Sequence, residues 1–138
     1  MHPTARVPAL VLLGISHGST GAAGAETPIE KASKALCLRY CGACHGPDGK
    51  GDGVASSLLT PKPTDLTGLA KKNGGQFPFE RTMQAIDGRN TPRAHGDPAM
   101  PVWGDIFQAQ AGWSSTQRAE IEGRLFLITE YIRSIQQQ

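Results

Sequence analysis

The pentapeptide Cys41-Gly42-Ala43-Cys44-His45 constrains what this chain can fold into more than any other feature. Two cysteines three residues apart on a helix lie on one face, so both sulfurs can form thioethers with the two vinyl groups of one porphyrin. The next residue, His45, then brings an imidazole to one face of the porphyrin, where it can ligate the iron. The C-x-x-C-H spacing is therefore the pattern for attachment of a c-type haem.

Two other uses of a C-x-x-C pair are a redox-active dithiol and half of a zinc site. A thioredoxin-like dithiol is expected in a β-α-β setting, and no part of the sequence has that pattern. Zinc usually takes four nitrogen or sulfur ligands in two separated pairs, but after His45 the chain has no cysteine and only one more histidine, His95. Because the sequence contains no second C-x-x-C-H, we predict one covalently bound haem c as the cofactor.

The N-terminus has the composition of an export signal. Arg6 precedes an apolar run, residues 7–15, that is too short to span a bilayer. Small residues follow and end in Ala23-Gly24-Ala25, which predicts cleavage before Glu26. We therefore expect residues 1–25 to be a cleaved signal peptide. Residues 26–138 are expected to form a single periplasmic domain without stable membrane insertion.

Charge and composition narrow the possible partners. The formal net charge of +2 falls by one when Arg6 is removed. This small positive charge does not indicate binding to nucleic acid or to an anionic membrane. The 17 glycines and 10 prolines make the chain rich in loops. A small, loop-rich chain without disulfides has difficulty building a core, and a buried porphyrin would supply the missing apolar mass.

The third cysteine, Cys37, lies one helical turn before Cys41 and outside the C-x-x-C-H spacing. The favoured interpretation is a buried, inert thiol. An intermolecular disulfide and a redox sensor are the alternatives for an odd cysteine in an exported protein.

The segment before the haem motif has the pattern of a helix. Pro28 is suited to the first turn. Apolar residues then recur at near-helical spacing, and these are Ile29, Ala32, Leu36 and Tyr40. The sequence therefore predicts an N-terminal helix that delivers Cys41 and Cys44.

The segment after the haem motif is predicted to be mainly loop. Residues 46–53 form a glycine-dense turn, and residues 58–69 an extended loop with a helical turn near 66–72. We expect this loop to cover one haem face and to accept, on a backbone carbonyl, the hydrogen of the other imidazole nitrogen of His45.

Two later segments have helical spacing. Residues 79–87 carry Phe79, Met83 and Ile86 at i, i+4 and i+7, a stripe typical of core. The last segment opens with a capping box, in which Ser114 is the N-cap and Gln117 the N3 residue. One apolar face follows, made of Ile121, Leu125, Ile128, Ile132 and Ile135. This is the clearest helix in the sequence.

The segment Met100-Pro101-Val102-Trp103-Gly104 carries the second piece of chemistry. A thioether is a soft, neutral ligand suited to haem iron opposite histidine, where it raises the reduction potential. After the predicted signal peptide the only other methionine is Met83, whose helical spacing already explains it as core. Met100 is therefore the predicted second iron ligand.

With both motifs in place, the chain resembles a class I cytochrome c of the bacterial monohaem kind. The resemblance covers nearly all of residues 28–136. It rests on four segments, which are 33–46, 86–89, 100–104 and 130–134. It implies an all-α cytochrome c fold, with small helices and long loops wrapped around one haem and with the N- and C-terminal helices crossing.

The resemblance also implies roles for individual residues. Cys41 and Cys44 would hold the haem, His45 would be the proximal ligand and Met100 the distal ligand. Trp103 would pack at the haem edge near a propionate.

Two positions depart from the pattern of the family, and both fall at the helix crossing. Members often have glycine where Ser33 stands and an aromatic residue where Cys37 stands. Because cysteine fills less volume than an aromatic ring, we expect the crossing to be looser or to be filled from the other helix, by Phe126 or Tyr131.

Three functions are compatible with these residues. The first is a periplasmic one-electron carrier, a monomer and not an enzyme, that serves a periplasmic donor and acceptor protein. The second is a dedicated electron-accepting subunit of a periplasmic dehydrogenase or oxidase. The third is a gas-binding haem sensor or enzyme in which Met100 is displaced and His95 acts as distal base or alternative ligand.

Overall fold

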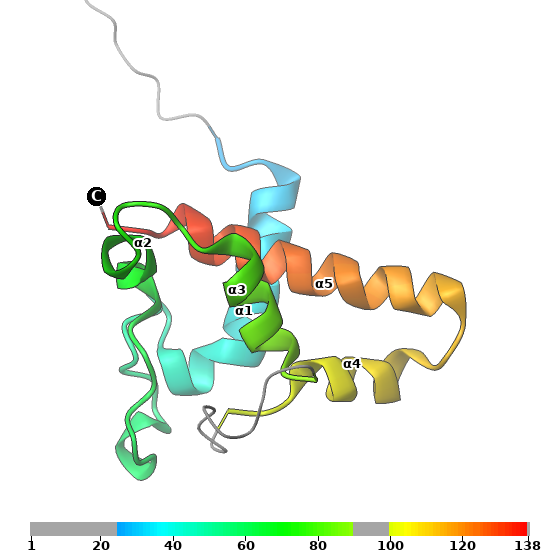
Figure 1. Ribbon diagram of the computed structural model, residues 1–138, viewed down its shortest axis with the longest axis horizontal. Helices are drawn as coiled ribbons and strands as arrows, with labels where there is room; N and C mark the ends of the chain where they lie inside the picture. The colour runs from blue at the N-terminus through cyan, green and yellow to red at the C-terminus, as the bar shows by residue number, and fades with distance from the viewer. Residues whose placement is uncertain (1–24, 90–99, 138) are drawn as a thin grey trace, which may run out of the picture.

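The computed structural model of the chain describes residues 25–89 and 100–137 (Figure 1). Almost all of the predicted signal peptide, and His95, therefore lie outside the described residues. The helices are α1 (Pro28–His45), α2 (Leu69–Lys72), α3 (Phe79–Asp87), α4 (Trp103–Ala111) and α5 (Ser115–Ser134), with 3-10 turns η1 (Ser56–Leu58) and η2 (Leu66–Gly68). The described ranges contain no strand, and the all-α prediction is confirmed.

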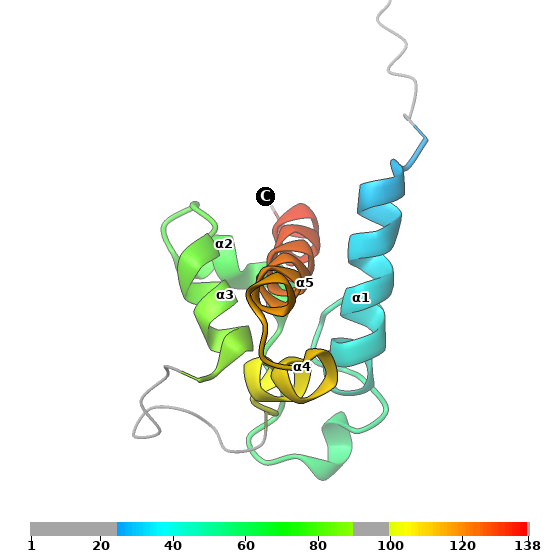
Figure 2. The ribbon, with the colours of Figure 1, turned by 90° about the vertical axis from the view of Figure 1, so that its right-hand side faces the viewer.

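Helix α5 is the centre of the arrangement. It crosses α1 in Figure 1, and in Figure 2, where α5 is seen end-on, α1 lies on one side of it and α3 on the other. Helix α4 packs against α5 as well. The predicted crossing of the N- and C-terminal helices is therefore confirmed.

Both long helices begin with a capping box. At α5 the predicted pair is observed, since the Ser114 side chain accepts from the backbone of Gln117 and the Gln117 side chain accepts from the backbone of Ser114. At α1 the cap is Thr27, whose hydroxyl accepts from the Glu30 backbone at 3.2 Å, while its own N–H donates to the Glu30 carboxylate at 2.7 Å. Each box satisfies N–H groups that have no partner within the helix.

The hydrophobic core follows the apolar face of α5. Its buried members are Cys37, Cys41, Ile86, Phe107, Ile121, Leu125, Ile128 and Ile132. The predicted face of α5 is confirmed, except that Ile135 is only partly buried. Phe107 comes from α4, a helix that the sequence analysis did not predict, and its side chain is fully buried.

The α1–α5 crossing is closely packed around small residues of α1. Ser33 and Cys37 are 3% and 6% exposed. Tyr131 of α5 packs against the core here, and burial together with the neighbouring Cys37 raises its pKa. The expectation that Phe126 fills the crossing is wrong, because its side chain is 48% exposed and its ring contacts Phe79 of α3.

No helix within residues 25–89 and 100–137 is long and apolar enough to cross a membrane.

Candidate haem-binding site

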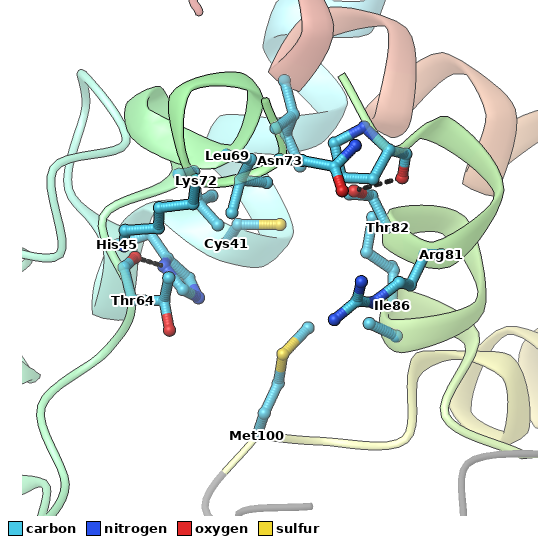
Figure 3. A pocket seen from close by; sticks show the side chains of 14 residues that line it. Cys41, His45, Thr64, Leu69, Lys72, Asn73, Arg81, Thr82, Ile86 and Met100 are labelled. Carbon is cyan, nitrogen blue, oxygen red and sulfur yellow. Dashed lines mark hydrogen bonds between the residues drawn. The ribbon is translucent and has the colours of Figure 1, made fainter. Parts of the chain in front are cut away.

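A pocket of about 360 Å³ opens between the C-terminal end of α1, helices α2 and α3, and the segment that precedes α4. Its lining is mainly apolar and includes Cys41 from α1, Ile86 from α3 and Ile132 from α5. Figure 3 shows His45 on one side of this pocket and Met100 on the other. The two residues predicted to ligate the iron therefore face one apolar space.

His45 is the last residue of α1, and its ring is held by a backbone carbonyl. The Nδ1 atom lies 2.8 Å from the carbonyl oxygen of Thr64. Because a carbonyl oxygen only accepts, Nδ1 carries the hydrogen and Nε2 keeps its lone pair in the neutral ring. The other ring nitrogen faces the pocket (Figure 3). The prediction that a carbonyl of loop 58–69 accepts this hydrogen bond is confirmed.

The Thr64 carbonyl is positioned by the glycine-dense turn. The backbone N–H of Leu66 donates to the Gly49 carbonyl at 2.7 Å, and that of Gly51 donates to the His45 carbonyl at 2.8 Å. Gly51 has a φ of 78°, and a Cβ there would collide with the Pro63 carbonyl. Only glycine lets the turn and the loop that carries Thr64 come this close.

The same turn continues along the end of α1. The Ala43 and Cys44 carbonyls accept from the N–H groups of Ala55 and Gly53 at 2.9 and 3.1 Å. A Cβ on Gly53 would collide with the Ala43 carbonyl. Carbonyls that a helix end leaves without partners are thus satisfied, and the haem motif is held in a fixed conformation.

The two cysteines of the motif differ in position. Cys41 is 6% exposed and lines the pocket, whereas Cys44 is partly buried and lies outside the lining. The thiols of Cys41 and Cys37 interact, and this hydrogen bond together with burial raises the pKa of Cys41. Cys37 itself is buried in the core, in agreement with the favoured interpretation of an enclosed thiol.

Met100 and Met83 occupy different environments. The Met100 side chain extends into the pocket and is 36% exposed (Figure 3). Met83 packs against the core and is not part of this lining. Of the methionines that the structure describes, only Met100 is therefore placed opposite His45.

The segment that presents Met100 is fastened to the end of α3. Gly88 ends α3 with a left-handed φ of 71°. Arg89 Nε then donates to Asp87 Oδ1 at 2.7 Å. This ion pair lies directly against Gly104, where a Cβ would collide with both side chains. The sequence analysis noted these residues as part of a resemblance but did not identify the contact.

Trp103 begins α4 and anchors it to α1. Its ring lies edge-on to Tyr40, with 5.2 Å between centroids, and tilted against Phe107 at 5.8 Å. Trp103 is not part of the pocket lining, and its predicted place beside a propionate stays a prediction.

The donor set of the pocket fits haem. No group of three or more His, Cys, Asp or Glu side chains in the described part of the chain is arranged to hold a metal. One imidazole and one thioether across an apolar pocket, beside a buried cysteine, are donors of the kinds that suit a c-type haem. The fold and the site together define an all-α haem protein.

The family comparison agrees with this class. The sequence profile of the family Cytochrome c matches residues 29–122, which is more than half of the chain. The chain belongs to the cytochrome c family, whose general function is haem-based electron transfer. Comparison with curated proteins and with solved structures gave no significant match.

Proposed function

We propose that the chain is a periplasmic one-electron carrier in which one haem c is attached through Cys41 and Cys44 and ligated by His45 and Met100. Residues 1–25 are removed on export, and residues 26–138 act as a monomer between a donor and an acceptor protein. The observation that carries this proposal is the placement of His45 and Met100 on opposite sides of one apolar pocket (Figure 3).

Haem, when bound, supplies a one-electron iron couple. The chain fixes the two ligands before any electron moves. The Thr64 carbonyl orients the His45 ring and increases its basicity, while Pro101 restricts the backbone beside Met100. Because both ligands are held by the protein in either oxidation state, little rearrangement accompanies electron transfer. A haem iron ligated by both His45 and Met100 would leave no open position for a substrate, which favours a carrier over an enzyme.

Small residues near the two ligands support access by a partner. Ala43, beside the attachment cysteines, and Pro101, next to Met100, are both exposed. A redox partner would meet little side-chain bulk there. This supports exchange through an exposed edge of the cofactor.

The proposal is tested first by the covalent bond. Mature protein made in cells that install c-type haem should keep its colour in the protein fraction after extraction with acidified acetone. A Cys41→Ala, Cys44→Ala double variant should release any bound haem into the solvent. Release of haem from the wild type would contradict the proposed attachment.

The carrier role is tested by turnover. The purified holo-protein should be monomeric by light scattering and should be reduced and reoxidised by separate periplasmic redox proteins at catalytic rates. Isolation in fixed stoichiometry with one dehydrogenase or oxidase would favour the subunit function instead. Rapid binding of carbon monoxide to the reduced wild type would favour the gas-binding function.

A further inference from the structure

One side chain just beyond the end of α5, that of Gln136, fastens the helix to the loop wall of the pocket. Its Oε1 atom accepts from the Ala70 N–H at 2.8 Å. Its Nε2 atom donates to the carbonyls of Leu66 and Ile132, both at 2.7 Å. Leu66 and Ile132 line the pocket from different elements, η2 and α5. The Gln136 amide therefore joins two parts of the pocket wall.

These bonds satisfy backbone groups that helices leave unpaired. The N–H groups in the first turn of a helix and the carbonyls in the last turn have no partner within it. Ala70 lies in the first turn of α2 and Ile132 in the last turn of α5. An amide offers one oxygen acceptor and two N–H donors, and Gln136 uses all three. A side chain without an amide could not replace it.

The segment that Gln136 fastens carries the acceptor of His45. Leu66 follows two residues after Thr64, whose carbonyl lies 2.8 Å from His45 Nδ1 (Figure 3). The Leu66 N–H donates to the Gly49 carbonyl at 2.7 Å. Leu66 is thus held on its amide side by the glycine-dense turn and on its carbonyl side by Gln136. Because hydrogen bonds are directional, the two together fix the position of the loop.

The residues on either side of Gln136 contact the same two segments. Ile135 packs so closely on the glycine-dense turn that a Cβ on Gly49 would lie 2.8 Å from Ile135 Cδ1. The backbone N–H of Gln137 donates to the Thr67 carbonyl at 2.9 Å. The chain after α5 therefore braces both the turn and the loop that surround the His45 ring.

We propose that Gln136 is a positioning residue for the proximal ligand, which holds the Thr64 carbonyl against His45 and thereby lowers the reduction potential of the iron. The inference rests on the proposed haem site. A carbonyl that accepts the Nδ1 hydrogen makes the imidazole more basic, and a more basic ligand stabilises ferric iron more than ferrous iron. Without Gln136 the loop is held less firmly, this hydrogen bond weakens, and the potential rises.

The principal variant is Gln136→Met, which keeps the length of the side chain but has neither the N–H donors nor the oxygen acceptor. At a fixed ambient potential we expect the ratio of reduced to oxidised protein to shift about threefold toward reduced. In proton NMR of the reduced, diamagnetic protein, the Nδ1–H signal of His45 should move upfield and exchange faster with solvent. The melting temperature should also fall, because three hydrogen bonds are lost.

Two controls separate positioning from stability. Gln137→Met makes the same change at the next residue, whose hydrogen bond to Thr67 comes from the backbone and survives, so the potential and the Nδ1–H signal should stay near those of the wild type. Thr129→Val removes a buried hydrogen bond within α5 that does not reach the loop. It should lower the melting temperature and leave the potential and the Nδ1–H signal unchanged. The same result for Gln136→Met would overturn the proposal.

Failure of the haem site itself is recognised separately. Covalent haem and a ferric iron–methionine absorption band in the wild type establish the site before any Gln136 variant is compared. If Gln136→Met does not fold, Gln136→Asn decides the question, because its amide is one methylene too short to reach all three partners. An unchanged potential and an unchanged Nδ1–H signal in Gln136→Asn would then overturn the positioning role.

Discussion

Ser33 has the one buried side-chain polar atom without a hydrogen-bond partner in the described residues. It lies at the α1–α5 crossing, where the side chain is 3% exposed. Because a buried hydroxyl without a partner keeps its full desolvation cost, Ser33→Ala should stabilise the fold by about 1 kcal/mol in urea unfolding. Thr129→Val, which removes a buried hydroxyl that donates to the Leu125 carbonyl at 2.8 Å, should instead cost about 1 kcal/mol. A loss of stability in Ser33→Ala would show that the hydroxyl has a partner.

Cys37 occupies the same crossing and lies outside the haem motif. Cys37→Ser should give a holo-protein with an unchanged visible spectrum, because the thioethers are assigned to Cys41 and Cys44. The melting temperature should fall, because the variant buries a hydroxyl in the core, at a cost of about 1–3 kcal/mol. Mass spectrometry measures whether the haem is still attached, and thermal unfolding followed by circular dichroism measures the melting temperature. Loss of haem from this variant would mean that the thiols are misassigned.

Among the elements, the glycine-dense turn after α1 is the one on which the site depends most. Gly51 combines a left-handed φ with close contact to the Pro63 carbonyl. Gly51→Ala should cost at least about 1–2 kcal/mol of folding stability, and it should displace the loop that carries the Thr64 carbonyl. The His45 ring would then lose its acceptor, which the reduction potential and proton NMR of the ring would both report. Gly74→Ala is the control, since Gly74 also has positive φ but no atom within 4 Å of a Cβ. Equal effects at both positions would contradict this account.

Substitution of Gly123 should affect only the stability of α5. It is exposed in the middle of the helix, and a Cβ there would meet no atom within 4 Å. Gly123→Ala should therefore stabilise the protein by about 1 kcal/mol through helix propensity. Ala119→Gly, at another exposed position of α5, should cost a similar amount. Unchanged or lower stability in Gly123→Ala would mean that the open position is needed by the fold.

The helices differ in how far the sequence predicts them. Helices α1 and α5 are predictable because proline, capping residues and apolar spacing agree with one another. Helix α4 was missed, because it is nine residues long and is preceded by a proline and a loop. Its buried Phe107 packs against the Tyr40 ring of α1, and α4 as a whole packs against α5; such long-range packing has no local signal.

At the scale of the whole molecule, the site is assembled from segments far apart in sequence. Cys41, His45 and Met100 were predictable as chemistry, because C-x-x-C-H and Met-Pro are local patterns. Two other features were not predictable, because both depend on how α3 packs against the rest of the chain. They are the contact of Gly104 with the Asp87–Arg89 pair and the position of Arg81 in the pocket lining. The fold brings the predicted ligands to one pocket and leaves Trp103 outside its lining.

The central claim is that His45 and Met100 ligate one iron across this pocket, and the ferric near-infrared spectrum tests it most directly. The wild type should show the weak charge-transfer band of iron–methionine ligation. Met100→Ala should lose the band, lower the reduction potential and open the ferrous protein to carbon monoxide, whereas Met83→Leu should leave all three nearly unchanged. A band that persists in Met100→Ala, or a wild type that never shows it, would contradict the assignment and leave His95 as the leading distal candidate.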